Sequence, residues 1–414
     1  MIGALDMAEC RPRELADVRL SAGVLVAVIV GAAIGCVAWG VSTDIRTLLV
    51  IGLLPMAWRL TPSRWAAGAL MMGYFAAGAR GLPRGAVVFF GDTAPSWWGV
   101  AMWLGVCVCL SAPFMLFWSR GPWRGIGFVA GLAACAVPPL GIVGWLSPMT
   151  AAGVLFPGCG WLGLALTAIA FGVTAGLHTW RGVFALIAAA SFANAVAPVP
   201  ARAPQRWLGF DTSFARLSSA GSGYASQLLA SMDRIQWLNQ VADQMPANAV
   251  LVLPETLIGR MDGVAEGLLA QTQAALAAKH SRVLAGAELP ELGERYGNAL
   301  VVLGAEPSED HAAVQGIPVP ISMWKPWAKD GASADLLGRG GVVTVMGRRV
   351  AVSICYEQLL TFSLLQSMSA QPDVLVAVSN VWWANSTNIP TIQAQSVRAY
   401  ARLFNVPVVS AKNI

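Results

Sequence analysis

The sequence predicts an α-helical polytopic membrane domain followed by an α/β domain, and three observations predict it. Only 12% of the 414 residues are charged and 56% are hydrophobic. The mean hydropathy of +0.60 is typical of a membrane protein. From Leu20 to Pro200 the few ionisable residues are mostly isolated arginines, whereas acids and bases return at ordinary density after about Arg202. We therefore expect a membrane domain over 1–200 and a soluble domain over 201–414.

The first half contains enough apolar stretches for about seven transmembrane helices. A span needs about 20 apolar residues. The first stretch follows three arginines, is long, and has no clear cleavage pattern, so it indicates a retained anchor and not a signal peptide. The stretches that meet or approach the required length are 20–40, 46–60, 65–83, 97–118, 126–147, 157–177 and 182–200.

Arginine placement predicts the orientation, because cytoplasmic loops keep positive charge. Arg80 and Arg84 fall on the opposite side in this count. Seven spans would place everything after Pro200 outside the cytoplasm. We therefore expect a multi-pass protein of the bacterial inner membrane with its second domain in the periplasm. With the N-terminus inside, the cytoplasmic loops carry Arg59, Arg64, Arg120, Arg124 and Arg181.

The membrane half has two interpretations, a passive anchor or a cradle that holds lipid or substrate. Proline and glycine in "CAVPPLGIVGW" would allow broken helices around a cavity. A transporter would need ionisable residues inside the spans, and these are nearly absent. The net charge of +5 is explained largely by arginines at helix ends, so we expect no nucleic-acid partner.

Beyond the Pro-rich segment 198–206 the pattern indicates strands alternating with helices. The strands are almost continuously apolar, which indicates a sheet covered by helices. Predicted helices cover 224–242, 260–279, 357–369 and 390–403. Predicted strands are "WLGF", "AVLVLPE", "SRVLAGAEL", "NALVVLG", "RVAVSICYE", "DVLVAVSN" and "VPVVSA".

Two residues with catalytic chemistry lie at predicted strand ends, Glu255 and Cys355, where such folds gather functional groups. A thiol attacks an acyl carbon as thiolate, and a carboxylate could take its proton. A lysine would then favour the anion. Cys355 alone would more often be a buried structural residue, and Glu255 fits the first turn of a helix equally well. No metal-site spacing is present, since the histidines are scattered singly.

Three motifs in order behind a multi-span domain carry a family resemblance: "VLVLPE", "VAVSICYE" and "AVSNVWWANSTNIPTIQAQSVRAYARLFNVPVVSAKN". The sequence resembles the nitrilase (carbon–nitrogen hydrolase) superfamily and, within it, apolipoprotein N-acyltransferase. By "PVPISMWKPW" and the double tryptophan it is more similar to TraB-type conjugal transfer proteins. The resemblance implies a nitrilase-like αββα sandwich, no cofactor, and thioester chemistry. Glu255 would be the general base, Cys355 the nucleophile and Glu357 a supporting carboxylate, with Trp383 and Arg398 binding substrate.

The sequence departs from the family pattern at the lysine. Gln315 stands at that position, and the nearest replacements are Lys325 and Lys329, of which we favour Lys325. The family's loop glutamate is replaced by Met323. The family continues past "VPVVSAKN", so with Ile414 as the last residue we also expect a domain truncated at its C-terminus.

The resemblance implies membrane-bound acyl transfer or amide hydrolysis that serves conjugal transfer or pilus assembly. The acyl donor would be a phospholipid or another acyl compound, and the acceptor an amine or a pilin-like protein. The alternative is a catalytically inactive nitrilase-fold scaffold or interaction module of the conjugation apparatus, which the absent lysine and the early end favour. Intact Glu255 and Cys355 oppose it.

Overall fold

The computed structural model describes residues 10–40, 42–91, 94–121, 123–176, 180–214, 224–338 and 341–414. The chain divides into two compact units. The first comprises Met1–Ala197 and Thr387–Thr391, and the second comprises Pro198–Ser386 and Ile392–Ile414.

In the part of the first unit that the structure describes, all regular secondary structure is helical. Its helices are α1 (Cys10–Ala38), η1 (Ile45–Leu53), α2 (Leu54–Arg59), α3 (Arg64–Gly78), α4 (Leu82–Phe90), α5 (Trp98–Leu116), α6 (Arg124–Ala136), η3 (Leu140–Ile142), η4 (Pro148–Ala151), α7 (Ala152–Leu155), α8 (Gly160–Gly176) and α9 (Trp180–Ala195).

Two of the described helices are long and apolar enough to cross a membrane, over Ser21–Ala38 and Trp98–Leu116. A third candidate is a broken pair, Pro148–Leu155 with Gly160–Gly176, bent by 119°. The break follows the proline and glycine of "FPGCGWLG", which interrupt a helix. A total of seven spans stays a prediction.

Polar side chains join distant segments inside this unit. Trp39 Nε1 donates to the Tyr74 hydroxyl at 2.9 Å, and that hydroxyl donates to Leu146 O, also at 2.9 Å. Asn388, from the late segment that belongs to this unit, donates to Trp39 O and Gly78 O at 2.8 Å each. These bonds supply donors to backbone carbonyls inside the unit, and Arg80 Nη1 also donates to Trp39 O at 3.1 Å.

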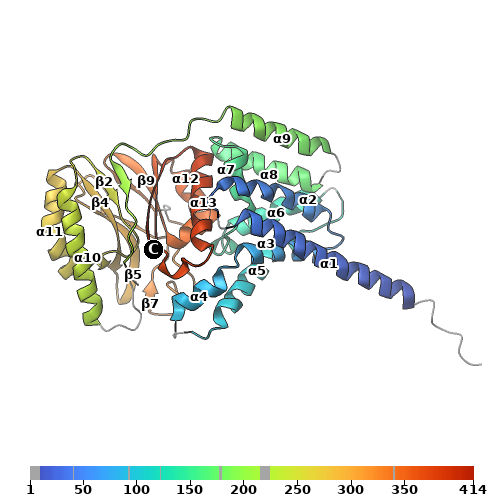
Figure 1. Ribbon diagram of the computed structural model, residues 1–414, viewed down its shortest axis with the longest axis horizontal. Coiled ribbons are helices and arrows are strands. Elements are labelled where there is room, and N and C mark those ends of the chain that lie inside the picture. The colour runs from blue at the N-terminus through green and yellow to red at the C-terminus, as the bar shows by residue number, and fades with distance from the viewer. Residues whose placement is uncertain are drawn as a thin grey trace, which may run out of the picture. The chain divides into compact units, whose positions relative to one another are not determined.

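The second unit contains two β-sheets (Figure 1). The seven-stranded sheet follows the order β1-β2-β4-β5-β6, with β3 paired to β4 and β7 to β5; the four-stranded sheet follows β11-β10-β9-β8. The strands are β1 (Trp207–Gly209), β2 (Val250–Val252), β3 (Gly259–Arg260), β4 (Arg282–Pro290), β5 (Glu294–Leu303), β6 (Ala312–Val314), β7 (Asp330–Ala332), β8 (Val342–Val345), β9 (Arg348–Ile354), β10 (Val374–Asn380) and β11 (Val408–Asn413).

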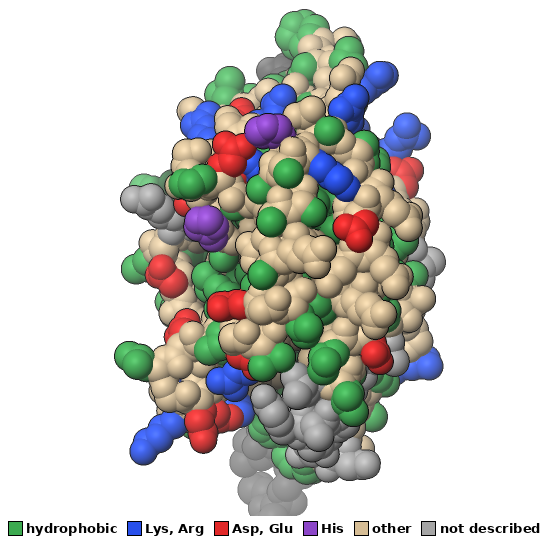
Figure 2. Space-filling model, turned by 90° about the vertical axis from the view of Figure 1, so that its left-hand side faces the viewer, with side chains coloured by type: hydrophobic (Ala, Val, Ile, Leu, Met, Phe, Trp, Pro, Cys, Tyr) green, Lys and Arg blue, Asp and Glu red, His purple; other side chains and the backbone are tan. Residues whose placement is uncertain are grey.

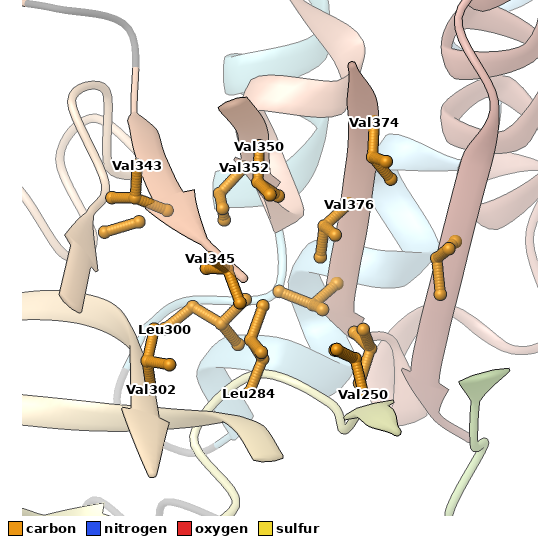
Figure 3. Close-up of a cluster of buried hydrophobic side chains, with 14 of the residues drawn as sticks. Val250, Leu284, Leu300, Val302, Val343, Val345, Val350, Val352, Val374 and Val376 are labelled. Carbon is orange, nitrogen blue, oxygen red and sulfur yellow. The ribbon is translucent and has the colours of Figure 1, made fainter. Parts of the chain in front are cut away.

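The two sheets pack face to face through a core of branched aliphatic side chains (Figure 3). Leu284 and Leu300 come from the seven-stranded sheet, while Val345, Val352 and Val376 come from the four-stranded sheet, and all five are buried. Alternate residues of each strand point into this layer, as the two-residue period of a strand requires.

Helices cover the outer faces of both sheets (Figure 1). Helices α10 (Tyr224–Gln244) and α11 (Gly263–Ala278) pack their apolar sides on β4 and β5. Figure 2 shows the face that these two helices form, on which acidic and basic side chains are interspersed. Helices α12 (Thr361–Ser369) and α13 (Ile389–Phe404) lie beyond the four-stranded sheet. The unit therefore has the helix, sheet, sheet, helix layering that the family resemblance implies.

Candidate active site

Glu255 lies just after β2, and a glycine on the neighbouring strand makes room for it. A Cβ built on Gly286 would lie 2.1 Å from Thr256 N and 2.5 Å from the Glu255 Cα. Only a residue without a side chain allows the two backbones to approach so closely. The turn is held by Gly286 N donating to Pro254 O at 3.0 Å and Ile258 N donating to Gly286 O at 2.9 Å.

Cys355 occupies a strained turn directly after β9. Its φ is +48°, in the left-handed region that side-chain-bearing residues rarely adopt. The chain passes there from β9 into the 3₁₀ helix η5 (Cys355–Leu359). The thiol is buried and hydrogen-bonded to the Glu255 carboxylate. This turn therefore directs the sulfur from the four-stranded sheet toward a carboxylate supplied by the other sheet.

Asn298 and Gln315 form an amide network beside Glu255. Asn298 Nδ2 donates to Glu255 Oε1 at 2.7 Å and to Gln315 Oε1 at 2.8 Å. Gln315 Nε2 donates to Ile354 O at 2.8 Å, and Ile354 immediately precedes Cys355. Both amides are buried. The residue at the lysine position is thus a neutral group built into the site.

Glu357 ties the turn at Cys355 to the loop after β6. Its Oε1 accepts from Gly316 N at 2.9 Å and from Ile317 N at 3.2 Å, and its Oε2 accepts from Ile354 N at 3.0 Å. Burial, the largest cause, raises the pKa of Glu357 to about 7, while the three backbone N–H groups act in the opposite direction. The contacts of this carboxylate suit a supporting role.

The environment of the Glu255 and Cys355 pair disfavours both charged forms. Burial raises the pKa of Glu255, against hydrogen bonds from Asn298, Cys355 and Asn380. Burial also raises the pKa of Cys355, and the adjacent Glu255 carboxylate raises it further. Asn380 N donates to Glu255 Oε2 at 3.0 Å and also opposes the rise at the sulfur. The hydrogen bond thus lets the two groups share one proton. No cation is among the residues that shift these two pKa values.

Lys325 lies in a different setting. Its Nζ donates to Asp330 Oδ2 at 3.0 Å, and this ion pair is one-third exposed on the lysine side and half exposed on the aspartate side. The described contacts of Lys325 do not include Glu255 or Cys355. Lys329 is exposed, and Met323 is half-buried. The structure thus brings Glu255, Cys355 and Glu357 together, with Gln315 among them.

The two expected substrate-binding residues have different positions. Trp383 is half-buried in η6 (Trp382–Ala384), and its Nε1 donates to Asn380 O at 3.1 Å. Because Asn380 N in turn donates to Glu255 Oε2, Asn380 connects this tryptophan to the candidate base. Arg398 is exposed on α13.

Three further residues complete the site and were not expected from the sequence: Asn298, Asn380 and Gln393. Gln393 Nε2 donates to Cys355 O at 2.9 Å and lies 4.0 Å from Sγ. Asn298 opens the predicted strand "NALVVLG" and Asn380 closes "DVLVAVSN", and a polar residue at the end of an apolar run was the available signal. Within the described part of the chain, no group of three His, Cys, Asp or Glu residues could hold a metal ion.

Two curated proteins resemble this chain over nearly its whole length. One is the conjugal transfer protein TraB of Agrobacterium fabrum, 32% identical over 410 residues, which cover 94% of this chain and 93% of the relative. The other is the probable conjugal transfer protein TraB of Sinorhizobium fredii, 35% identical over 396 residues, covering 92% and 95%.

Two further proteins show more distant similarity. An apolipoprotein N-acyltransferase of Haemophilus ducreyi is 25% identical over 191 residues, covering 42% of this chain and 38% of the relative. Among solved structures, an amidase mutant from Nesterenkonia sp. AN1 with acrylamide added to its active-site cysteine aligns with a TM-score of 0.31 and 12% identity, over 50% of this chain and 77% of the amidase. No protein-family profile matches the sequence.

Proposed function

Since this chain belongs to the family of TraB conjugal transfer proteins, we propose that it is a membrane-anchored enzyme that moves an acyl group through a thioester on Cys355. The observation that carries the proposal is the hydrogen bond between the buried Glu255 carboxylate and the Cys355 thiol, at a turn where Cys355 has φ +48°. A buried structural cysteine needs neither a carboxylate partner nor a strained backbone.

In the first half-reaction Glu255 accepts the thiol proton and the sulfur attacks the acyl carbon of an ester or amide. The C–S bond forms, the bond to the leaving group breaks, and Glu255 returns the proton to that group. In the second half-reaction an amine or water attacks the thioester, Glu255 takes its proton, and the sulfur leaves as the thiol. The raised pKa of Glu255 makes its carboxylate a stronger base for the first step.

The substrates and the compartment are part of this proposal. The acyl donor is a phospholipid or another acyl compound near the membrane, and the acceptor is an amine or a pilin-like protein of the conjugation apparatus. The catalytic unit faces the periplasm. The apolar helices of the first unit and the TraB relatives support this setting.

A second candidate function is an inactive scaffold in the same apparatus. The observation that favours it is the neutral Gln315, held between Asn298 and Ile354 O, where the acyltransferases place a lysine. Without a cation the thiolate is harder to form, which would impair catalysis. A protein that keeps the fold only for docking would tolerate this loss.

Detection of an acyl adduct decides between the two functions. The purified full-length protein in lipid nanodiscs is incubated with phospholipid, and the peptide that contains Cys355 is analysed by mass spectrometry. Acyl transfer predicts a hydroxylamine-sensitive adduct that Cys355→Ser abolishes and that Glu255→Gln slows at least a hundredfold. Cys159→Ser, in the first unit, is the matched control and should keep the adduct. An unmodified Cys355 that is also inert to thiol reagents would establish the scaffold.

A further inference from the structure

Glu288 is a carboxylate on the inner face of the seven-stranded sheet, beside the candidate base. Strand β4 carries Leu284, Gly286 and Glu288 at two-residue spacing, so all three face the same side. Leu284 points into the layer between the sheets (Figure 3), and Gly286 contacts the Glu255 backbone. Glu288 therefore continues this row past the position of Glu255, and it is half-buried.

The register of β4 and β5 places Glu288 directly opposite Asn298. Side chains of such a pair share one face, with Cβ atoms about 5 Å apart. Asn298 in turn donates to Glu255 at 2.7 Å. Tyr296, two residues before Asn298 on the same face, has its pKa raised by burial and also by the negative fields of Glu288 and Glu255. Glu288, Asn298, Tyr296 and Glu255 therefore surround one region on the inner face of the seven-stranded sheet.

This region is rich in hydrogen-bond acceptors. Asn298 is buried, and its Oδ1 has no hydrogen-bond partner among the described residues. Within the described ion pairs, none involves Glu255, Glu288 or Glu357. The basic residue whose field reaches Glu288 is Arg260, its exposed register partner on β3. The Glu288 carboxylate and the unpartnered Asn298 Oδ1 are two acceptors on one face, and such a pair suits a group that donates several hydrogen bonds and carries positive charge.

We propose that Glu288 and Asn298 Oδ1 bind a primary ammonium group of the acyl acceptor, so that the acceptor brings the positive charge that the residues around Cys355 lack. The proposal rests on the proposed acyl transfer. The bound ammonium loses one proton to solvent, and the amine attacks the Cys355 thioester. The C–N bond forms and the C–S bond breaks. Glu255 transfers the second amine proton to the sulfur, which leaves as the thiol.

The binding step is tested without turnover, by protection of the thiol. Full-length protein in nanodiscs is alkylated at Cys355 with iodoacetamide in the presence of butylammonium chloride, with sodium chloride at equal ionic strength as reference. Butylammonium should slow alkylation of the wild type, and Glu288→Gln should raise the concentration needed about tenfold, as expected for a hydrogen bond to a charged group. Glu288→Asp keeps the charge and should retain part of the protection.

Glu266→Gln removes the same charge from exposed α11, outside the site, and is the matched control. In this variant butylammonium should slow the alkylation of Cys355 as much as it does in the wild type. Equal protection in wild type and Glu288→Gln, or none in the wild type, would overturn the proposal whether or not the protein forms an acyl adduct.

The transfer step is tested with two acceptors of different charge, butylamine, which is an ammonium ion at neutral pH, and hydroxylamine, which is neutral. Glu288→Gln should raise the KM for butylamine about tenfold and that for hydroxylamine less than twofold. An equal loss with both acceptors would indicate a structural role and contradict the proposal. Absence of any wild-type adduct would instead remove the proposed function, and the protection experiment would still decide on ammonium binding.

Discussion

Asn298 donates to Glu255 Oε1 at 2.7 Å and to Gln315 Oε1 at 2.8 Å through the same nitrogen. One buried amide thus fixes the candidate base against the residue that stands at the lysine position. Because Gln315 is in turn bound to Ile354 O at 2.8 Å, this chain of hydrogen bonds runs from the candidate base Glu255 to the residue before Cys355. A charge introduced at residue 315 would therefore lie one hydrogen-bonded residue away from Cys355.

Gln315→Lys should make Cys355 more reactive. An ammonium group in this network favours the thiolate and lowers the pKa of the thiol, and each unit of change is a factor of ten in the thiolate fraction below the pKa. We expect iodoacetamide to alkylate Cys355 about tenfold faster near neutral pH, measured by peptide mass spectrometry. Gln315→Met, which is neutral, is the control and should show no increase. Equal rates in the lysine variant and the wild type would contradict the prediction.

Gly286→Ala should displace the candidate base. The new Cβ would lie 2.1 Å from Thr256 N and 2.5 Å from the Glu255 Cα, so the backbone itself must move. We expect a loss of about 2 kcal/mol or more in stability, seen as a lower thermal midpoint, and slower adduct formation at Cys355.

Gly267→Ala is the matched control for this substitution. Gly267 lies inside α11, where a Cβ would meet nothing within 4 Å. Alanine is favoured over glycine in a helix by about 1 kcal/mol, so this variant should be slightly more stable than the wild type. Similar thermal midpoints for the two alanine variants would show that the close backbone approach at Gly286 does not determine stability, and would contradict the prediction.

Arg282→Met should destabilise the second unit strongly. The Arg282 side chain is buried and donates to Glu309 Oε2 at 2.6 Å and Glu306 Oε1 at 3.0 Å. Removing the guanidinium takes away the charged partner of Glu309, whose carboxylate keeps, among the described residues, only the backbone N–H groups of Glu306 and Met346 as donors. Breaking a buried ion pair costs about 3–5 kcal/mol. Thermal unfolding in detergent measures the loss, and Arg348→Met, at an exposed position of β9, should have little effect. If Arg282→Met with Glu309→Gln is no more stable than Arg282→Met alone, the unpaired charge is not the cause.

The stability of the second unit should fall as pH rises through neutrality. The pKa of Glu357 is about 7 in the folded protein, above its ordinary value of 4.5, so the folded state binds this proton more tightly than the unfolded state. Its contribution is fully present below about pH 4.5 and is lost as pH rises through about 7. Burial raises the pKa of Glu255 and Glu288 as well, which adds to the same trend.

The test compares thermal midpoints between about pH 5 and pH 8 in wild type and Glu357→Gln. The glutamine does not titrate, so its midpoint should depend less steeply on pH, although it should be less stable at low pH because its NH₂ cannot accept a backbone N–H. Glu266→Gln should keep the wild-type slope. Parallel curves for wild type and Glu357→Gln would assign the pH dependence to other groups.

The sequence predicted the long apolar strands, and also the short β1 and β2, which lie in "WLGF" and "AVLVLPE". "DVLVAVSN" contains β10, whereas only the first six residues of "RVAVSICYE" lie in β9, and its last three residues, Cys355 to Glu357, begin η5. Continuous apolar runs of this length are typical of interior strands in a covered sheet. The four predicted helices correspond to α10, α11, α13 and, for 357–369, to η5 followed by α12. Four other short strands, β3, β6, β7 and β8, were not predicted, because a run of two to four residues carries little periodicity of its own.

The sequence by itself determined that an acidic residue and a cysteine end two apolar strands, and that a membrane-type half precedes them. Only the tertiary structure decided that Glu255 and Cys355 meet across two different sheets, that Gln315 and not Lys325 lies beside them, and that Glu288 faces Asn298. The reason is physical. Apolar periodicity is a local property of the chain, whereas strand register and sheet packing choose which distant side chains share a face.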